Sequence, residues 1–179
     1  MAKCPQTLGG IPLTCETSMG GIKKVFIADW NNVTGVEEQE GMITAITMDS
    51  GKYFNPYEFR KQTGSMNSTL TADETAGVNY VTTELSLVFT KMETAKRIEM
   101  SALAKGQLAV IVLDCNGKYW YLGKDDYVSS SAGGASTGTN KGDQNAYTLT
   151  LKDESETYPF EIMKSAVEAV INKEYDKGE

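Results

Sequence analysis

The sequence contains no histidine, only three cysteines and no long apolar run. Without histidine, the chain lacks the usual general base near neutral pH and the commonest metal ligand in proteins. Cys4, Cys15 and Cys115 form no Cys-x-x-Cys pair, and their odd number favours free thiols over a Cys4–Cys15 bridge. No segment has the apolar length of a signal peptide or a membrane span. We therefore expect a soluble chain, made in a reducing compartment, with no metal, cofactor or membrane span.

Positive charge is also scarce. Lys and Arg number 17 against 24 Asp and Glu, which gives a formal net charge of −7. A protein that grips nucleic acid needs a Lys/Arg surface to neutralise phosphates, so this balance argues against such a function. It is compatible with a surface past which DNA slides.

The length of 179 residues fits one domain. A chain of this size buries about 70% of its unfolded surface, so its core needs no disulfide or metal. We expect a β-rich domain over residues 23–163 and a C-terminal helix over 164–179. Residues 1–22 are rich in Gly, Thr and Pro. They form either an N-terminal arm that orders against a neighbour or a loop packed on its own domain.

The longest predicted strand runs from Val78 to Thr90. Its apolar face ends in Leu85, Leu87 and Phe89, and its other face is mostly small and polar. That alternation is typical of a strand with one wet side. With residues 61–71 and the connection "ADETAG" it predicts a long antiparallel hairpin, whose arms span about 30 Å.

A helix is predicted directly after this hairpin. Thr90 and Glu93 have the spacing of a capping box, and Gly106 stands where a helix stop is expected. An apolar stripe at helical spacing supports the helix: Met92, Ala95, Ile98, Ala102 and Leu103.

The remaining pattern predicts further strands. Residues 108–113 are apolar on both faces, which predicts a central strand, and Asn116-Gly117 favours a type I′ turn into the next strand. The acidic segment 31–41 is interpreted as a turn. Eight or nine strands in antiparallel pairs predict a mainly β fold, an antiparallel sandwich or barrel with the long hairpin, one flanking α-helix and a short C-terminal helix.

No catalytic, cofactor or metal site is predicted. The carboxylates cluster in segments interpreted as solvated turns, without the Asp-x-Asp-x-Asp-Gly spacing of a calcium loop. Cys115 has no histidine to activate it. The Ser/Gly-rich segment 127–145 lacks the Gly-Lys-Ser/Thr of a phosphate-binding loop, and a strand rather than a helix follows it.

Segment 127–145 is instead interpreted as a long loop between strands. Loops beyond about 12–15 residues in compact domains tend to be functional or disordered. We expect this loop to contact another subunit or protein, and its candidate contact residues are Ser129, Gly134, Thr137, Asn140 and Lys141.

The order of elements resembles the tail-tube fold of tailed-bacteriophage virion proteins. A sandwich with a long hairpin that has one small-polar face, followed by a helix and further hairpins, carries the resemblance over residues 24–163. The Asn-Gly turn, "KYWYLG" and "GDQNAYTLTLKDESETYPFEI" also look like virion proteins of crAss-like phages of Bacteroidota. The Gly-rich arm and the terminal helix are not part of this resemblance.

This resemblance implies a non-enzymatic structural protein of the virion tail, made in the cytoplasm of the host bacterium. In that family the subunits close into a ring, a hexamer or higher, whose hairpins line a channel for DNA. The implied partners are copies of the chain and other tail or portal-adjacent proteins. The residues expected to face the channel are Ser65, Asn67, Thr82, Glu84 and Ser86. The alternatives are a β-rich adhesion or ligand-binding module without catalysis and, with the least support, an enzyme with a carboxylate pair.

Overall fold

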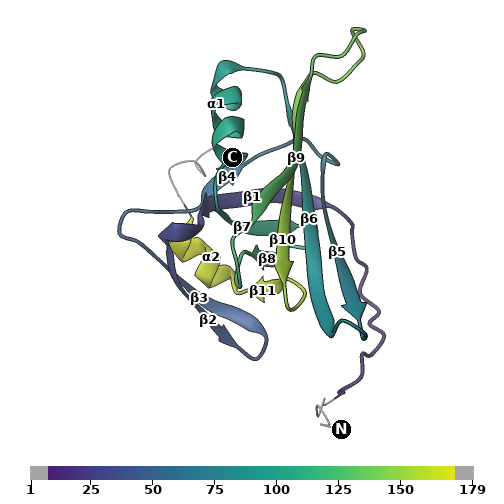
Figure 1. Ribbon diagram of the computed structural model, residues 1–179, viewed down its shortest axis with the longest axis vertical. Helices are drawn as coiled ribbons and strands as arrows, with labels where there is room; N and C mark the ends of the chain where they lie inside the picture. The colour runs from purple at the N-terminus through teal and green to yellow at the C-terminus, as the bar shows by residue number, and fades with distance from the viewer. Residues whose placement is uncertain (1–7, 172–179) are drawn as a thin grey trace.

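The computed structural model describes residues 8–171, which form two β-sheets and two α-helices. The seven-stranded sheet has the order β2-β3-β11-β8-β7-β1-β4, and the four-stranded sheet has the order β5-β6-β10-β9. Figure 1 shows the two sheets packed against each other. The predicted mainly β sandwich, with one flanking helix and a short C-terminal helix, is confirmed. The strands of the larger sheet are β1 (Ile22–Asp29), β2 (Val33–Gln39), β3 (Met42–Met48), β4 (Asn55–Tyr57), β7 (Leu108–Asp114), β8 (Tyr119–Leu122) and β11 (Phe160–Ile162).

Strand β7 lies in the interior of the seven-stranded sheet, between β8 and β1, as its two apolar faces predict. Val110 and Val112 point to one side of the sheet, where they join the core shared with the smaller sheet. Ala109 and Ile111 point to the other side and join a second core. Two buried faces on one strand therefore require a layer on each side of this sheet.

The smaller sheet supplies the layer on one side. It consists of β5 (Gly64–Asp73), β6 (Val78–Thr90), β9 (Ser129–Ser136) and β10 (Ala146–Ser155), and each neighbouring pair is antiparallel. The predicted long hairpin is β5–β6, with its turn after Asp73. Leu85, Leu87 and Phe89 are buried in the core between the sheets, as predicted.

Helix α2 (Lys164–Val170) supplies the layer on the opposite side. Ala166, Val167 and Val170 pack there with Ile43 and Phe54. The helix was expected over residues 164–179. It ends at Val170 among the described residues, and residues 172–179 lie outside them.

The predicted helix after the hairpin exists as α1 (Thr94–Leu103), but its predicted start is wrong. Thr90 remains in β6, paired with Ala146 of β10, so strand pairing takes the residue that was expected to cap the helix. Lys91 then adopts φ 68°, and the helix begins after Glu93 without a side-chain cap. Within α1 only Leu103 is buried, and Ile98 is 58% exposed. Helix α1 therefore stands at one end of the sandwich rather than flat against it (Figure 1).

Four local expectations need correction. Residues 33–39, interpreted as part of a turn, form strand β2, paired with β3. The first half of the expected long loop, residues 129–136, forms strand β9, paired with β10. The hairpin after β7 exists, but Asn116 keeps a negative φ and only Gly117 is left-handed, at 83°. That conformation fits a longer turn with one left-handed glycine rather than a type I′ turn. Only antiparallel pairs were predicted, but one strand pair, β3 with β11, is parallel.

Residues 8–20 contain no helix or strand and extend away from the sandwich as an arm. The arm is attached at its base. The Asn116 side chain accepts a hydrogen bond from the Met19 N–H at 2.8 Å and donates to the Met19 carbonyl at 3.1 Å. Cys15 and Cys115 are free thiols, whereas Cys4 lies outside the described residues.

Candidate functional site

The most distinctive surface is the outer face of the four-stranded sheet, which no other described layer covers. Pairing registers place the expected channel-facing residues on this one face. Ser65 pairs with Ser86, and Asn67 pairs with Glu84. Thr82 lies on the next rung, opposite Thr69. The five side chains are therefore brought together as neighbours across β5 and β6, each exposed or half-buried.

Strand β10 extends these rungs. Thr150 pairs with Ser86, Lys152 with Glu84 and Glu154 with Thr82. This face, defined here as the polar face, is thus built mainly from hydroxyls, an amide and three charges, with Tyr80 and Val88 on the same side of β6. Lys152 and Glu154 form an ion pair at 2.6 Å, and the Glu154 carboxylate raises the pKa of Lys152, with smaller contributions from Tyr80 and Glu84. Two carboxylates against one ammonium leave the centre of the polar face weakly acidic.

Residues outside the expected five complete the polar face. They are Thr148, Thr150, Lys152 and Glu154. Lys152 and Glu154 were missed because the sequence pattern predicts a strand over residues 146–151 only, whereas β10 continues to Ser155. Thr148 and Thr150 lie within that predicted strand, but its pairing with β6 was not predicted. Period-two alternation carried four residues further would have found Lys152 and Glu154 on the outer side.

The two edges of this sheet differ from the edges of the larger sheet. Strand β4 is three residues long and contains Pro56, and β2 carries Glu37 and Glu38 with two register shifts. Short length, proline, charge and bulges are the devices that protect sheet edges from pairing with other chains. Edge strand β5 has ten residues with one charge, Asp73 at its end, and β9 has eight residues that are all Ser, Ala or Gly. Strand β9 has one register shift, beside Thr150.

The second half of the expected contact loop, residues 137–145, remains a loop and extends past the end of the sheet, at the same end of the molecule as α1 (Figure 1). Its tip is folded around Asp143, whose carboxylate accepts the N–H groups of Asn140 at 2.6 Å and Thr139 at 2.8 Å. These two N–H groups hold the pKa of Asp143 below its usual value. Of the expected contact residues, Thr137, Asn140 and Lys141 lie in this loop, whereas Ser129 and Gly134 lie in edge strand β9.

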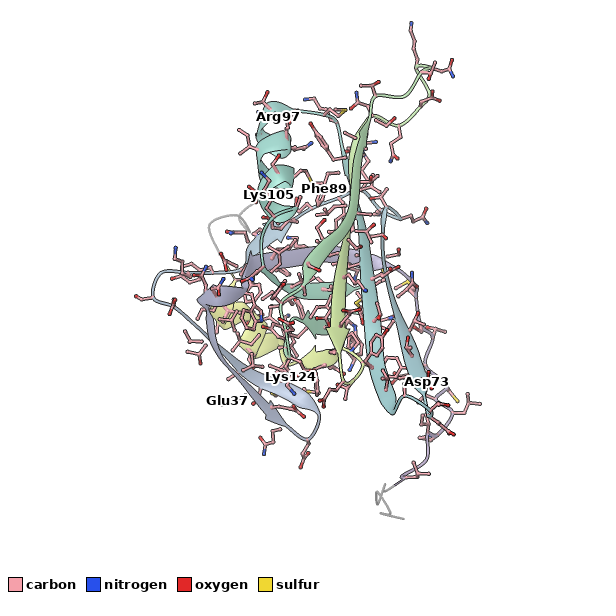
Figure 2. The ribbon with its side chains drawn as sticks, viewed as in Figure 1. Glu37, Asp73, Phe89, Arg97, Lys105 and Lys124 are labelled. Atoms are coloured by element: carbon pink, nitrogen blue, oxygen red, sulfur yellow. The ribbon has the colours of Figure 1, made fainter. Side chains whose placement is uncertain are left out.

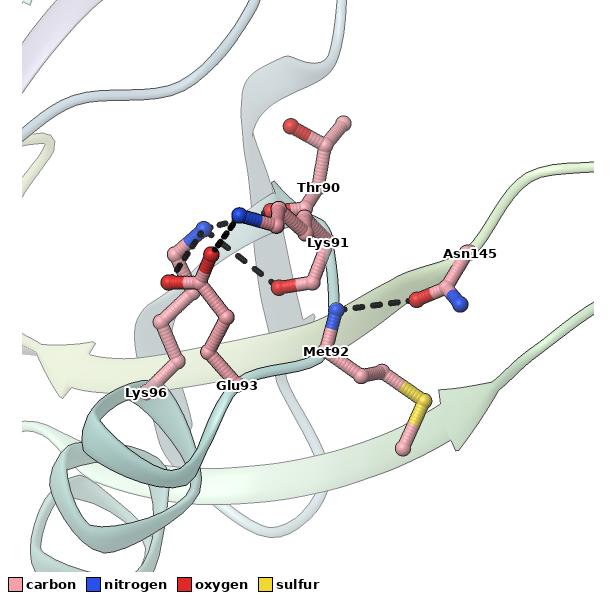
Figure 3. A network of polar contacts seen from close by, with 6 residues as sticks. All are labelled: Thr90, Lys91, Met92, Glu93, Lys96 and Asn145. Carbon is pink, nitrogen blue, oxygen red and sulfur yellow. Dashed lines mark hydrogen bonds and ion pairs between the residues drawn. The ribbon is translucent and has the colours of Figure 1, made fainter.

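The base of the loop is fixed to the junction of β6 and α1 (Figure 3). Asn145 accepts the Lys91 N–H through its carbonyl at 2.7 Å and the Met92 N–H through its side chain at 2.8 Å. The Lys96 ammonium donates to the Thr90 carbonyl at 2.6 Å, and Lys91 and Glu93 form an ion pair. The loop and α1 are therefore coupled at one end of the sheet.

The strongest perturbation of an acid occurs at Asp153, inside the sandwich. It is 3% exposed and accepts only two hydrogen bonds, from the Gly123 N–H at 3.1 Å and the Ser155 hydroxyl at 3.4 Å. Burial, with smaller contributions from Asp125 and Asp126, raises the pKa of Asp153 to about 6. The Tyr121 hydroxyl is buried and has no hydrogen-bond partner in the described part of the chain, and burial and the Asp153 charge raise its pKa.

This acid was missed by the sequence analysis, which assigned it to a solvated turn. Tyr147, Leu149 and Leu151 of β10 point into the core, and Asp153 is the next residue on that side. It faces the core through strand alternation, without an exposed cleft of its own. Among residues 8–171, no group of three His, Cys, Asp or Glu residues is arranged to hold a metal ion. No helix in that range is both long and apolar enough to cross a bilayer.

Comparison with known proteins gives no relative from which a function could be carried over. No protein-family model, no curated protein and no solved structure matches this chain.

Proposed function

We propose that this chain is a structural subunit of a tailed-bacteriophage virion, which closes into a ring or tube segment of the tail and forms a conduit for DNA. The observation that carries the proposal is the four-stranded sheet. One face is packed on the core, the other is polar and uncovered, and both edges are long, without proline and almost without charge. The edges of the larger sheet are protected, so long edges with little protection are specific to the four-stranded sheet.

The strand directions favour closure into a ring. All neighbours in the order β5-β6-β10-β9 are antiparallel, so the two edge strands run in opposite directions. Rotation of a copy about an axis parallel to the strands keeps each strand direction. The β5 edge of one copy would then meet the β9 edge of the next as another antiparallel pair. Such a head-to-tail contact repeats around a closed ring and leaves no free edge in that sheet.

The size of such a ring suits a conduit. Six copies would give a barrel of 24 strands. At a spacing of about 4.8 Å per strand, the distance between opposite backbones across the barrel is about 40 Å. Barrels of about 16–18 strands already enclose an aqueous channel. The polar face would line the channel with hydroxyls and a slight excess of negative charge, which repels phosphates and gives DNA few groups to bind.

The two ends of the sheet are suited to stacking of rings. Arg97 lies on α1 at one end, Lys105 follows the last residue of α1 at the base of the helix, and Asp73 lies at the β5–β6 turn at the opposite end (Figure 2). All three side chains are exposed. In a head-to-tail stack, the basic end of one ring would face the acidic end of the next, and loop 137–145 would reach towards the neighbouring ring or an adjoining tail protein.

A ligand-binding barrel would need room between its sheets. In this chain the space between the sheets is filled by side chains such as Leu85, Val110 and Leu149, each at most 2% exposed. The interior therefore favours an assembly role over a binding role of that kind.

The test is the effect of like charges at the two edges on assembly. Purified protein is examined by light scattering over a range of concentrations and by negative-stain microscopy, alone and with tail proteins of the same virion. We expect closed rings for the unmodified chain. Ser65 on β5 and Ala132 on β9 lie on one rung, which runs through Ser86 and Thr150. A variant with Ser65→Lys and Ala132→Lys should assemble poorly, because equal charges meet across each seam. A variant with Ser65→Lys and Ala132→Asp should regain assembly.

The matched control places the same charge on the same face away from the edges, at Ser86→Lys and Thr150→Lys. These residues are neighbours on the two inner strands. We expect the control to retain ring formation. A chain that stays monomeric in every condition, or edge variants that behave like the inner-strand control, would refute the proposed ring.

A further inference from the structure

The arm carries an apolar face that its own subunit does not cover. Ile11 is 99% exposed and Leu13 is 100% exposed. In an extended chain Ile11, Leu13 and Cys15 lie on one side, and Pro12, Thr14 and Glu16 lie on the other. This alternation is typical of a strand that packs one side on a core, yet the described structure provides no core beneath it.

The base of the arm is held in a defined position. Asn116 binds the backbone of Met19 through two hydrogen bonds, and the Cys115 N–H donates to the Gly21 carbonyl at 3.1 Å. Residues 8–15, beyond this anchor, make no hydrogen bond or ion pair within the described chain. The arm is therefore directed by its own subunit but does not pack on it.

The arm leaves the sandwich beside the open β5 edge of the four-stranded sheet. Ile22, the first residue of β1, lies over Gly64, the first residue of β5, so closely that a Cβ on Gly64 would come within 2.8 Å of the Ile22 side chain. In the view of Figure 1 the arm continues past β5 towards the β5–β6 turn. A chain that pairs with the β5 edge would be the nearest foreign surface to the arm.

The reach of the arm is sufficient for that surface. At about 3.3 Å per residue, an extended segment from residue 8 to residue 20 spans about 40 Å. Four strands at about 4.8 Å spacing are less than about 20 Å wide. The arm can thus cross the seam and reach across the four-stranded sheet of a neighbouring subunit.

We propose that residues 8–17 form an exchanged arm, which packs Ile11 and Leu13 onto the adjacent copy of this chain across the β5 edge. This inference rests on the proposed ring, because the ring places a second copy at that edge. The partner is a second copy rather than another protein, because the arm leaves its own subunit beside the edge that the ring closes. The arm is also long enough to reach across the four-stranded sheet of that copy.

The experiment compares two neighbouring positions on opposite sides of the arm, Leu13→Asp and Thr14→Asp. Both add the same charge to a fully exposed segment, so neither should change the melting temperature of the monomer. We expect Leu13→Asp to raise the concentration needed for half-maximal assembly by about tenfold or more, because it places a charge in an apolar contact. We expect Thr14→Asp to change that concentration by less than about threefold.

Cys15 provides an independent measurement on the unmodified chain. It is exposed in the isolated subunit, and it shares the side of Ile11 and Leu13. Its rate of reaction with a maleimide is followed by peptide mass spectrometry in dilute monomer and in assembled rings. We expect assembly to slow the reaction at Cys15 by about tenfold or more, and Leu13→Asp to abolish that protection.

The outcomes separate the arm from the ring. Rings that form equally well with Leu13→Asp, with Cys15 as reactive as in the monomer, would overturn the exchanged arm and leave the ring intact. Protection of Cys15 in dilute monomer would mean that the arm packs on its own subunit and would also overturn it. A chain that never assembles would refute the ring and the arm together.

Discussion

Asp153 is expected to make this protein less stable as the pH rises, contrary to the usual behaviour of an aspartate in an ion pair. The carboxyl is buried, no lysine or arginine is among the groups that shift it, and its pKa is raised to about 6 from an ordinary value of 3.8. The native state therefore holds a proton that the unfolded chain releases. The resulting stabilisation is complete below the unfolded pKa and is lost as the pH passes through the folded pKa.

The magnitude follows from the size of the shift. A displacement of about two pKa units corresponds to about 3 kcal/mol of unfolding free energy. We expect this amount to be lost between about pH 4 and pH 7. The substitution Asp153→Asn removes the buried charge, and the amide oxygen that it introduces can still accept the Gly123 N–H. At pH 8 the Asp153→Asn variant should be more stable than the unmodified chain by up to about 3 kcal/mol, and the difference should vanish towards pH 4.

The assay is urea denaturation of both chains at steps from pH 4 to pH 8. The other acids contribute equally to both chains, so the difference isolates Asp153. Glu154→Gln is the control: Glu154 is adjacent in sequence but exposed on the polar face, and its loss should change stability by less than about 1 kcal/mol at each pH. A stability difference between the unmodified chain and the Asp153→Asn variant that is constant with pH, or that favours aspartate at high pH, would refute the reasoning.

Three further outcomes are expected. Leu85→Ala should lower the unfolding free energy of the monomer by about 2–5 kcal/mol in a denaturation experiment, because Leu85 is fully buried between the sheets; a loss under about 1 kcal/mol would contradict the assigned core. Glu84→Lys should change monomer stability by less than about 1 kcal/mol. In assembled tails it should slow DNA ejection in a salt-dependent manner, because a ring of positive charge would then line the proposed channel. Ejection that is unchanged at low salt would argue against the channel position of Glu84. Labelling of the denatured, unreduced protein should modify Cys4, Cys15 and Cys115 alike, whereas a protected pair would contradict the free-thiol prediction.

The central strands could be predicted because their signal is local. Residues 108–113 are apolar on both faces, and the structure places them in β7, between two other strands. Leu85, Leu87 and Phe89 alternate with polar residues, and the structure buries them on one side of β6. In both cases the residue pattern within one strand determines which side meets a core.

The edge strand β9 could not be predicted in the same way. Its residues are Ser, Ala and Gly, which have low strand preference and no apolar face, so the segment resembled a loop. It becomes a strand because β10 offers a partner over the length from Ala146 to Lys152. The helix start failed for a related reason: Thr90 has the spacing of a cap, but its pairing with Ala146 holds it in β6. Both errors arise from pairing between segments distant in sequence, which local patterns do not encode.

The residues of the polar face were predicted only in part. Ser65, Asn67, Thr82, Glu84 and Ser86 lie together on the polar face because the β5–β6 register makes them neighbours. Their role in a channel stays a prediction, because it depends on contacts between copies. Asp153 was missed since it stands where an apolar residue continues the pattern of Tyr147, Leu149 and Leu151. The inward orientation of an acid at such a position can be predicted only when the length of the strand is known.

Three features of this chain are unfavourable for a solitary subunit. Strand β5 is an open edge, β9 is a second open edge without a single charge, and the arm exposes Ile11 and Leu13 almost completely. Open edges and exposed apolar chains promote uncontrolled association unless a specific contact covers them. The opposite directions of β5 and β9, and the exit of the arm beside β5, allow one head-to-tail contact between copies to cover all three. A binding module that functions alone would account for none of them, and for that reason we favour assembly over ligand binding as the role of this protein.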